Sequence, residues 1–270
     1  MWGIQLMHAI PTILRSKPVL SLQDEVAALR AELQVQRQAR IAAESKLTFL
    51  HAEPTESNPP PSRMAIIVGL AKLAESRDDD TGQHLSRIRH YTTLIATAVA
   101  ELYPDQLSTA EVPIIGATSV LHDIGKVGIS DDILLNPNKL SDKQFDTMKK
   151  HASIGADILI SLSEQLGRDP WVDTAIQITL GHHEKWDGSG YPFGLRGEIN
   201  NLPARIVAVA DVYDALTSKR AYKNAMTHQE AIAIIEKDTG THFDPMVVDA
   251  FLTVVNKIEE VATRLHNHAA

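Results

Sequence analysis

Histidine and aspartate residues recur in short blocks along this 270-residue chain, and the adjacent pair His122-Asp123 is the most informative of them. Such a pair offers a metal ion one imidazole nitrogen and one carboxylate oxygen, and Lys126 adds an ammonium group within a helical turn. Phosphoester hydrolysis needs metals to activate water, carboxylates to bridge the metals and a cation to hold phosphate. The sequence therefore predicts a multi-metal hydrolase site. The other blocks assigned to it are DDDTGQH at 78–84, His151, GHHEKWDGSGYP at 181–192 and AVADVYDAL at 208–216.

The pair His122-Asp123 follows an apolar stretch, 117–121, that we expect to be a buried helix. A charged pair at the end of such a helix is costly unless it is partnered. The alternative to a metal site is therefore a buried structural ion pair. Gly125 opens the backbone after the pair, so we expect Lys126 to project toward a ligand.

Two of the blocks are ambiguous when each is taken alone. Asp80 and His84 would lie four residues apart on one face of a helix, a spacing that suits a shared ligand. The acidic run that begins at Asp78 fits equally well a helix N-terminus, where carboxylates cap the chain and interact with the dipole. His151 lies alone on a predicted helix, where a surface or core role is more common, although Gly155 on the same face indicates a close approach. Their companions favour the ligand interpretation.

His182 and His183 end a predicted helix. Adjacent helical side chains point about 100° apart, so these two would reach different metals or opposite sides of one cluster. The alternative is a pair of exposed histidines interacting with the helix dipole. The loop that follows, 184–194, is rich in glycine and aromatic residues. Glycines let a backbone approach a ligand closely, so the loop resembles a pocket wall.

Asp211 follows 206–210, which is apolar all round, so we expect its carboxylate to be buried with its helix. A buried carboxylate demands a metal, a cation or several hydrogen bonds. Arg220 and Lys223 come soon afterwards. They could form a solvated face, as most basic residues do, or clamp a phosphate.

Composition narrows the class of protein further. The chain has no cysteine, which excludes disulfides, Cys-based zinc sites and thiol nucleophiles, and leaves His, Asp and Glu as ligands for iron, manganese or zinc. The net charge of −8 argues against a nucleic-acid polymer as partner, but not against a small phosphorylated substrate, since bound metals dominate the local potential. No apolar run approaches the roughly 20 residues that span a bilayer. We expect a cytoplasmic protein.

Apolar periodicity predicts an all-α fold with one long loop at 183–203. The expected helices lie near 64–77, 82–103, 108–125, 141–163, 171–182, 203–217, 227–238 and 245–264. Together they would form a catalytic domain over 63–264, followed by a short tail, 265–270.

The N-terminal region, 1–51, contains an amphipathic helix over about 20–50 with a short heptad pattern. It could pair two chains as a coiled coil, giving a homodimer, or pack on its own domain; both alternatives stay open. The segment 52–62 is proline-rich, so we expect an extended linker there.

The blocks resemble the HD-GYP family of bacterial signalling proteins, a branch of the HD superfamily of metal-dependent phosphohydrolases. The resemblance covers roughly 64–262 and includes an intact Gly190-Tyr191-Pro192 signature. It implies a helical HD-domain bundle and hydrolysis of cyclic di-GMP to pGpG and, in many members, onward to GMP. The matching blocks are HDIGK at 122–126, HHEKWDGSGYP at 182–192, ADVYDALTSKRAYK at 210–223 and HFDP at 242–245.

By position, the resemblance also implies a division of roles. Asp123 and Lys126 would be catalytic, and the metals would be two divalent ions, iron or manganese. The position often occupied by glutamate in members with a third metal is Asp80 here, and its shorter side chain makes a third metal weak or absent. The implied metal ligands are Asp80, His84, His122, Asp123, His151, His182, His183 and Asp211. The implied substrate-binding residues are Lys126, Gly190, Tyr191, Arg220 and Lys223.

Two other functions remain alternatives. One is an HD-superfamily enzyme that acts on a nucleotide monophosphate, a triphosphate or ppGpp. The other is a receptor that binds cyclic di-GMP without hydrolysing it and signals through its N-terminal helix. Because 1–62 is too short for a receiver domain, we expect the input signal to come through this helix, through a partner protein, or not at all.

Overall fold

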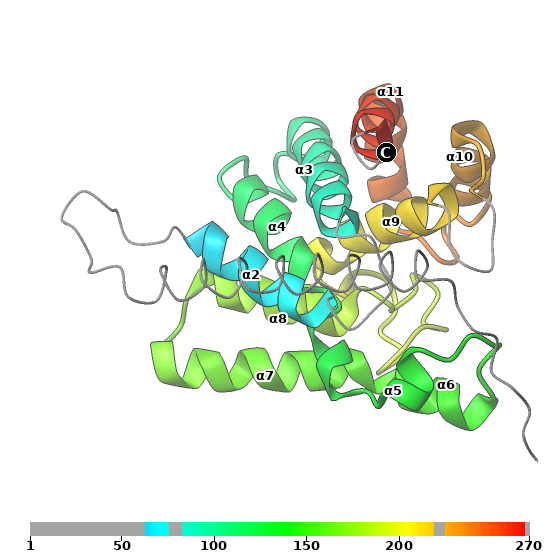
Figure 1. Cartoon of the computed structure of the whole chain (residues 1–270). Coiled ribbons are helices and arrows are strands. Elements are labelled where there is room, and N and C mark those ends of the chain that lie inside the picture. Colours follow the sequence, from blue (N-terminus) through cyan, green and yellow to red (C-terminus); the bar gives the residue numbers. More distant parts are fainter. Residues whose placement is uncertain (1–62, 76–82, 219–224, 268–270) are drawn as a thin grey trace, which may run out of the picture. The chain divides into compact units, whose positions relative to one another are not determined.

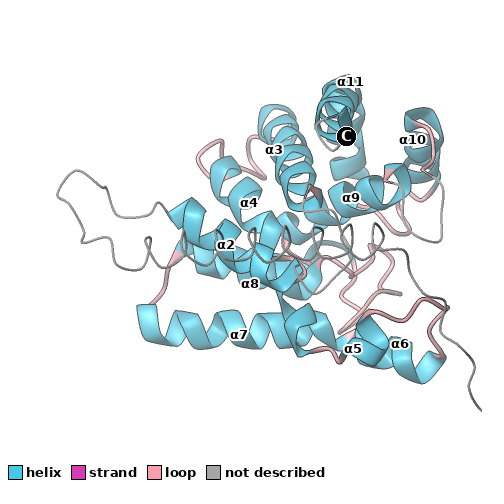
Figure 2. Ribbon diagram, viewed as in Figure 1, coloured by secondary structure: helices cyan, strands magenta, loops and turns pink. Residues whose placement is uncertain are grey.

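The computed structural model of the chain describes residues 63–75, 83–218 and 225–267. These residues form helices and loops without a β-strand, which confirms the all-α prediction (Figure 2). None of the described helices is both long and apolar enough to cross a membrane. The α-helices are α2 (Arg63–Glu75), α3 (His84–Leu102), α4 (Val112–Thr118), α5 (Asp131–Leu134), α6 (Asp142–Met148), α7 (Lys150–Leu166), α8 (Pro170–Gly181), α9 (Leu202–Thr217), α10 (His228–Lys237) and α11 (Pro245–Asn267). Three short 3₁₀ helices are η1 (Ser119–Leu121), η2 (Ile124–Gly128) and η3 (Gly197–Ile199).

Two hydrophobic clusters hold these elements together. The larger one joins α3 to α9 and α11, with Tyr91 and Phe251 fully buried at its centre. The smaller one joins α2, α7 and α8 to the 3₁₀ turns, through residues such as Leu121 and Leu159. Figure 1 shows α7 running beside α8, and α3 beside α11. The 3₁₀ turns therefore carry the His-Asp pair along the edge of a well-packed core.

The predicted helix 108–125 is wrong at its C-terminal end, because the α-helix stops at Thr118 and two 3₁₀ helices continue the chain. Gly125 explains this difference. A Cβ atom there would lie 1.9 Å from the carbonyl oxygen of His151 and 2.4 Å from the amide nitrogen of Gly155. The turn thus packs backbone against backbone on α7, which brings Asp123 within reach of His151.

The predicted helix 141–163 is also two helices, since α6 ends at Met148 and α7 begins at Lys150. Ser141 starts α6 with a capping box, in which its side chain and that of Gln144 satisfy each other's backbone N–H groups. The sequence prediction missed α5, which is only four residues long. The long loop at 183–203 is confirmed, with η3 as its one helical turn.

Several predictions fall on residues outside the described ranges. These are the helix over 20–50, the linker 52–62, and the side chains of Asp80, Arg220 and Lys223. At the other end of the domain, α11 continues to Asn267, beyond the predicted boundary at 264.

Candidate metal centre

Seven of the eight predicted ligands lie together in two adjoining groups. Within each group, one ligand atom of every residue lies within 4.8 Å of the others. The first cluster is Asp123, His151, His182 and His183, and the second cluster is His84, His122 and Asp211. The histidines of the first cluster come from α7 and the end of α8, whereas His84 begins α3 and Asp211 lies on α9. The fold thus brings together residues from five separate segments of the chain.

Asp123 lies between the two clusters. One carboxylate oxygen, Oδ1, is 3.2 Å from Nε2 of His151 and 3.8 Å from Nε2 of His182. The other oxygen, Oδ2, is 3.4 Å from Nε2 of His122. Each oxygen therefore faces a different cluster, which is the arrangement that a carboxylate needs to bridge two metal ions.

The imidazole rings are held with their Nε2 atoms toward the clusters. Nδ1 of His122 donates to the carbonyl of Ser119 at 2.9 Å, and Nδ1 of His151 donates to that of Met148 at 2.7 Å. Since a carbonyl can only accept, Nδ1 carries a proton, which leaves Nε2 as the ring nitrogen able to bind a metal. Nε2 of His151 and of His182 is buried without a hydrogen-bond partner among the described residues. These orphaned atoms fit metal ligands.

His182 and His183 belong to the same cluster, so the structure selects one of the two arrangements open to adjacent histidines. Their ring centroids are 4.0 Å apart, and the ring of His183 lies 5.0 Å from that of His151. Burial lowers the pKa of His183 far below its ordinary value, and the neighbouring His182 and His151 lower it further. His183 is therefore neutral, as a metal ligand must be.

Lys126 forms an ion pair within the centre, with Nζ 2.9 Å from Oδ2 of Asp123. The 3₁₀ turn places the ammonium of Lys126 beside the carboxylate three residues earlier, at the centre where a ligand would bind. Burial raises the pKa of Asp123, but the charge of Lys126 and, after it, the neighbouring His122 outweigh burial and hold that pKa well below its usual range. Asp123 is thus ionised and able to bind metal.

The prediction that Asp211 is buried is wrong in part, because 20% of its side-chain surface is exposed. The fully buried carboxylate of α9 is Asp214, one helical turn later. Arg87 donates to it through Nε at 2.5 Å and Nη2 at 3.0 Å, and Nδ1 of His84 donates at 2.8 Å. Burial raises the pKa of Asp214, but these hydrogen bonds from His84 and Arg87 outweigh it and lower that pKa to about 2.

Asp214 and Arg87 are thus functional neighbours that the sequence reasoning missed. The spacing of Asp211 and Asp214 could have indicated this contact. Residues three apart share a helix face, so on a buried helix the two carboxylates cannot both reach solvent and at least one needs a partner. Arg87 offered a second signal, as it lies three residues after His84 on the same helix. The pair fixes the ring of His84, whose Nε2 lies 3.4 Å from Nε2 of His122.

The GYP loop, residues 188–194, is held against the first cluster by Glu184. This carboxylate is buried and accepts the backbone N–H groups of Phe193 at 2.7 Å and Leu195 at 3.0 Å. Gly190 packs so tightly that a Cβ atom would lie 2.4 Å from the amide nitrogen of Lys185. The ring of Tyr191 consequently lies 4.7 Å from that of His183.

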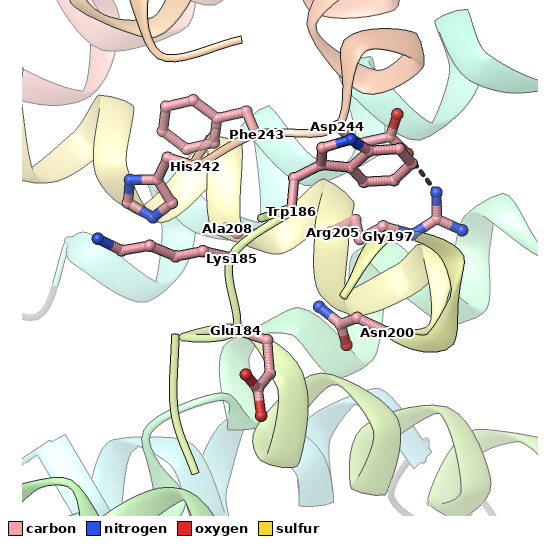
Figure 3. A pocket seen from close by; sticks show the side chains of 10 residues that line it. All are labelled: Glu184, Lys185, Trp186, Gly197, Asn200, Arg205, Ala208, His242, Phe243 and Asp244. Atoms are coloured by element: carbon pink, nitrogen blue, oxygen red, sulfur yellow. Dashed lines mark hydrogen bonds and ion pairs between the residues drawn. The ribbon is translucent and has the colours of Figure 1, made fainter. Parts of the chain in front are cut away.

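A small pocket lined by the start of the long loop, residues 184–186, shows how the HFDP block at 242–245 contributes (Figure 3). Arg205 of α9 forms an ion pair with Asp244, and its guanidinium lies 5.6 Å from the centroid of the Trp186 ring. The backbone N–H of Trp186 donates to the backbone carbonyl of His242 at 3.0 Å. These contacts fasten the start of the long loop to α9 and to the start of α11.

Comparison with known proteins matches residues 69–247 to a family described as HD domain. A probable cyclic di-GMP phosphodiesterase of Vibrio cholerae is 47% identical over 74% of this chain and 46% of its own length. A cyclic di-GMP phosphodiesterase of the same organism is 44% identical over 80% of this chain and 44% of its own. The cyclic di-GMP phosphodiesterase response regulator RpfG of Xanthomonas campestris is 40% identical over 74% and 50%, respectively. The chain thus spans about half the length of the curated relatives it matches.

Proposed function

Because the chain belongs to the HD domain family, within its HD-GYP branch, we propose that it is a metal-dependent phosphodiesterase that hydrolyses cyclic di-GMP to pGpG. The observation that carries this proposal is the position of Asp123, with one carboxylate oxygen toward the histidines of each cluster. Relatives that share this domain at 40–47% identity are named for the same substrate. Onward hydrolysis of pGpG to GMP would use the same groups.

Divalent metals bound to the two clusters, iron or manganese by our proposal, would lower the pKa of water and draw charge from the phosphate. Asp123 would contribute one carboxylate oxygen to each cluster and so fix the position of the two clusters relative to each other. Lys126, already at the carboxylate, would donate to a non-bridging phosphate oxygen in the transition state. Gly190 lets the GYP loop approach closely, and Tyr191 would position the dinucleotide at the first cluster.

Three predicted residues complete this scheme from outside the described ranges. Arg220 and Lys223 would hold the second phosphate of the dinucleotide, as their charge and position in the family pattern imply. Asp80 would contribute to a third metal site, which its short side chain makes weak.

The test is turnover of cyclic di-GMP by protein loaded anaerobically with iron or manganese, with the metal content quantified and the products separated by chromatography. We expect metal-dependent loss of substrate that is absent in His122→Ala, and the ratio of pGpG to GMP reports the second step. Cyclic GMP-AMP and ppGpp run in parallel, since preferential turnover of either would assign another substrate. Binding of cyclic di-GMP without hydrolysis in fully metallated protein would instead indicate a receptor.

Replacing Glu184 by glutamine should raise KM for cyclic di-GMP about tenfold and change kcat little, because one backbone N–H of the GYP loop loses its acceptor. Steady-state kinetics measure both constants. Glu198→Gln, a change at an exposed residue of the long loop 183–203 but outside the GYP loop, is the matched control and should behave as wild type. An unchanged KM in Glu184→Gln would show that the loop is held without this carboxylate.

A further inference from the structure

Phe145 on α6 is exposed to an unusual degree for a phenylalanine, with 46% of its surface accessible. Phe243 and Phe251, by contrast, are fully buried in the core. The other exposed phenylalanine in the described ranges is Phe193, two residues after Tyr191 in the GYP loop. Exposed aromatic rings beside a candidate active site indicate a ligand contact rather than packing.

A line of aromatic rings leads from the first cluster to Phe145. The ring of His151 lies 5.0 Å from that of His183, and the ring of His183 lies 4.7 Å from that of Tyr191. The ring of Tyr191 in turn lies 6.3 Å from that of Phe145, at an interplanar angle of 80°. Phe145 is therefore the next aromatic surface outward from the residues that would hold the metals.

The position of Phe145 is well defined. Its helix begins at the capping box of Ser141 and Gln144, so the backbone of the first turn is fixed. The ammonium of Lys149 lies 5.0 Å from the centroid of the Phe145 ring and is itself paired with Asp146 at 2.7 Å. Tyr191 and Lys149 thus hold the ring while much of its surface stays open.

We propose that Phe145 is a stacking platform for one purine base of the substrate, an inference that rests on the proposed function. A ribose separates each base from its phosphate, so a dinucleotide with a phosphate at the metal clusters places its base beyond their edge. Tyr191 and Phe145 lie there, and Lys149 adds a cation that would attract an electron-rich purine edge, such as the carbonyl oxygen of guanine. Stacking on an aromatic side chain needs no particular base, so the platform binds purines as a class.

The test compares wild type, Phe145→Ala, Phe145→Leu and Phe145→Trp as metal-loaded proteins that contain all 270 residues of the chain. We expect Phe145→Ala and Phe145→Leu to raise KM for cyclic di-GMP about 5- to 150-fold with kcat nearly unchanged, because stacking contributes to ground state and transition state alike. Phe145→Trp, which keeps an aromatic face, should stay near wild type. Ile160→Ala, which truncates an exposed side chain on α7, is the matched control.

Two further measurements separate a base contact from a structural role. Hydrolysis of methyl p-nitrophenyl phosphate, a phosphodiester without a nucleobase, should be equal in all variants. Binding of a cyclic di-GMP analogue that carries 2-aminopurine, followed by fluorescence, should weaken in Phe145→Ala by the same factor as KM rises. This binding readout does not require turnover, so it tests the platform even where wild type fails to hydrolyse cyclic di-GMP and the proposed function falls. KM and binding within twofold of wild type, or an equal loss on the base-free diester, would overturn the inference.

Discussion

Replacing Asp123 by asparagine should lower kcat for cyclic di-GMP by at least about 1,000-fold while the helical fold persists. The change preserves the shape of the side chain but removes the charge that both clusters share. The amide offers one oxygen and one NH₂ group, so it can face only one cluster as a ligand. The bound metal should consequently fall below the wild-type content. Elemental analysis of the purified variant and kinetics at saturating manganese measure the two effects.

Asp157→Asn is the matched control for this experiment. Asp157 is an exposed carboxylate on α7, the helix that also carries His151. Its neutralisation should change neither the metal content nor kcat. A variant of Asp123 that retains wild-type kcat with a full metal content would contradict the bridging role and, with it, the proposed mechanism.

Much of the metal centre could be predicted from the sequence because its ligands lie in short local patterns. The pair His122-Asp123 and the pair His182-His183 need only a helix end to bring two ligands to one place. The prediction of His151 as a ligand had less support, since a lone histidine forms no spacing pattern with another ligand. Gly155, on the same helix face, was the additional indication. That glycine lets α7 pack against the turn at Gly125. This contact joins two segments that are distant in the sequence, so it could not be predicted from a local pattern.

The rest depended on packing between segments. The sequence around Asp211 and Asp214 does not indicate which of them is fully buried. In the structure it is Asp214, because Arg87 of α3 donates hydrogen bonds to it, whereas Asp211 is partly exposed. The break between α6 and α7 falls at Lys149. The hydrophobic pattern continues through this residue, and no glycine or proline marks the end of a helix there, so the sequence did not indicate the break. The exposure of Phe145 could not be predicted, because a phenylalanine on an amphipathic helix is expected to face the core.

Replacing Asp214 by alanine should lower the free energy of unfolding by about 3 kcal/mol, because it removes the buried carboxylate that Arg87 and His84 contact. The affinity for metal should fall about 10- to 100-fold, since His84 loses the acceptor that orients its ring. Urea unfolding and metal titration measure the two quantities. Asp249→Ala removes an exposed hydrogen bond from Tyr103 and should cost at most about 1 kcal/mol.

The acid limb of the stability curve gives an independent check on Asp214. Its pKa is depressed from 3.8 to about 2 in the folded protein, so its contribution to stability is present above pH 4 and is lost as the pH falls through about 2. Wild type should therefore lose more stability over this interval than Asp214→Ala does. Parallel acid profiles of the two proteins would contradict the ionised, hydrogen-bonded state of Asp214.

The double variant Arg87→Met/Asp214→Leu separates the structural role of the buried pair from its role at the metal centre. Replacing both charges by apolar side chains should restore the free energy of unfolding to within about 2 kcal/mol of wild type, because no buried charge is left without its partner. The affinity for metal should nevertheless stay low, since leucine cannot accept the proton on Nδ1 of His84. Recovery of both quantities together would mean that Asp214 acts only through stability. Recovery of stability alone would establish Asp214 as the residue that orients His84.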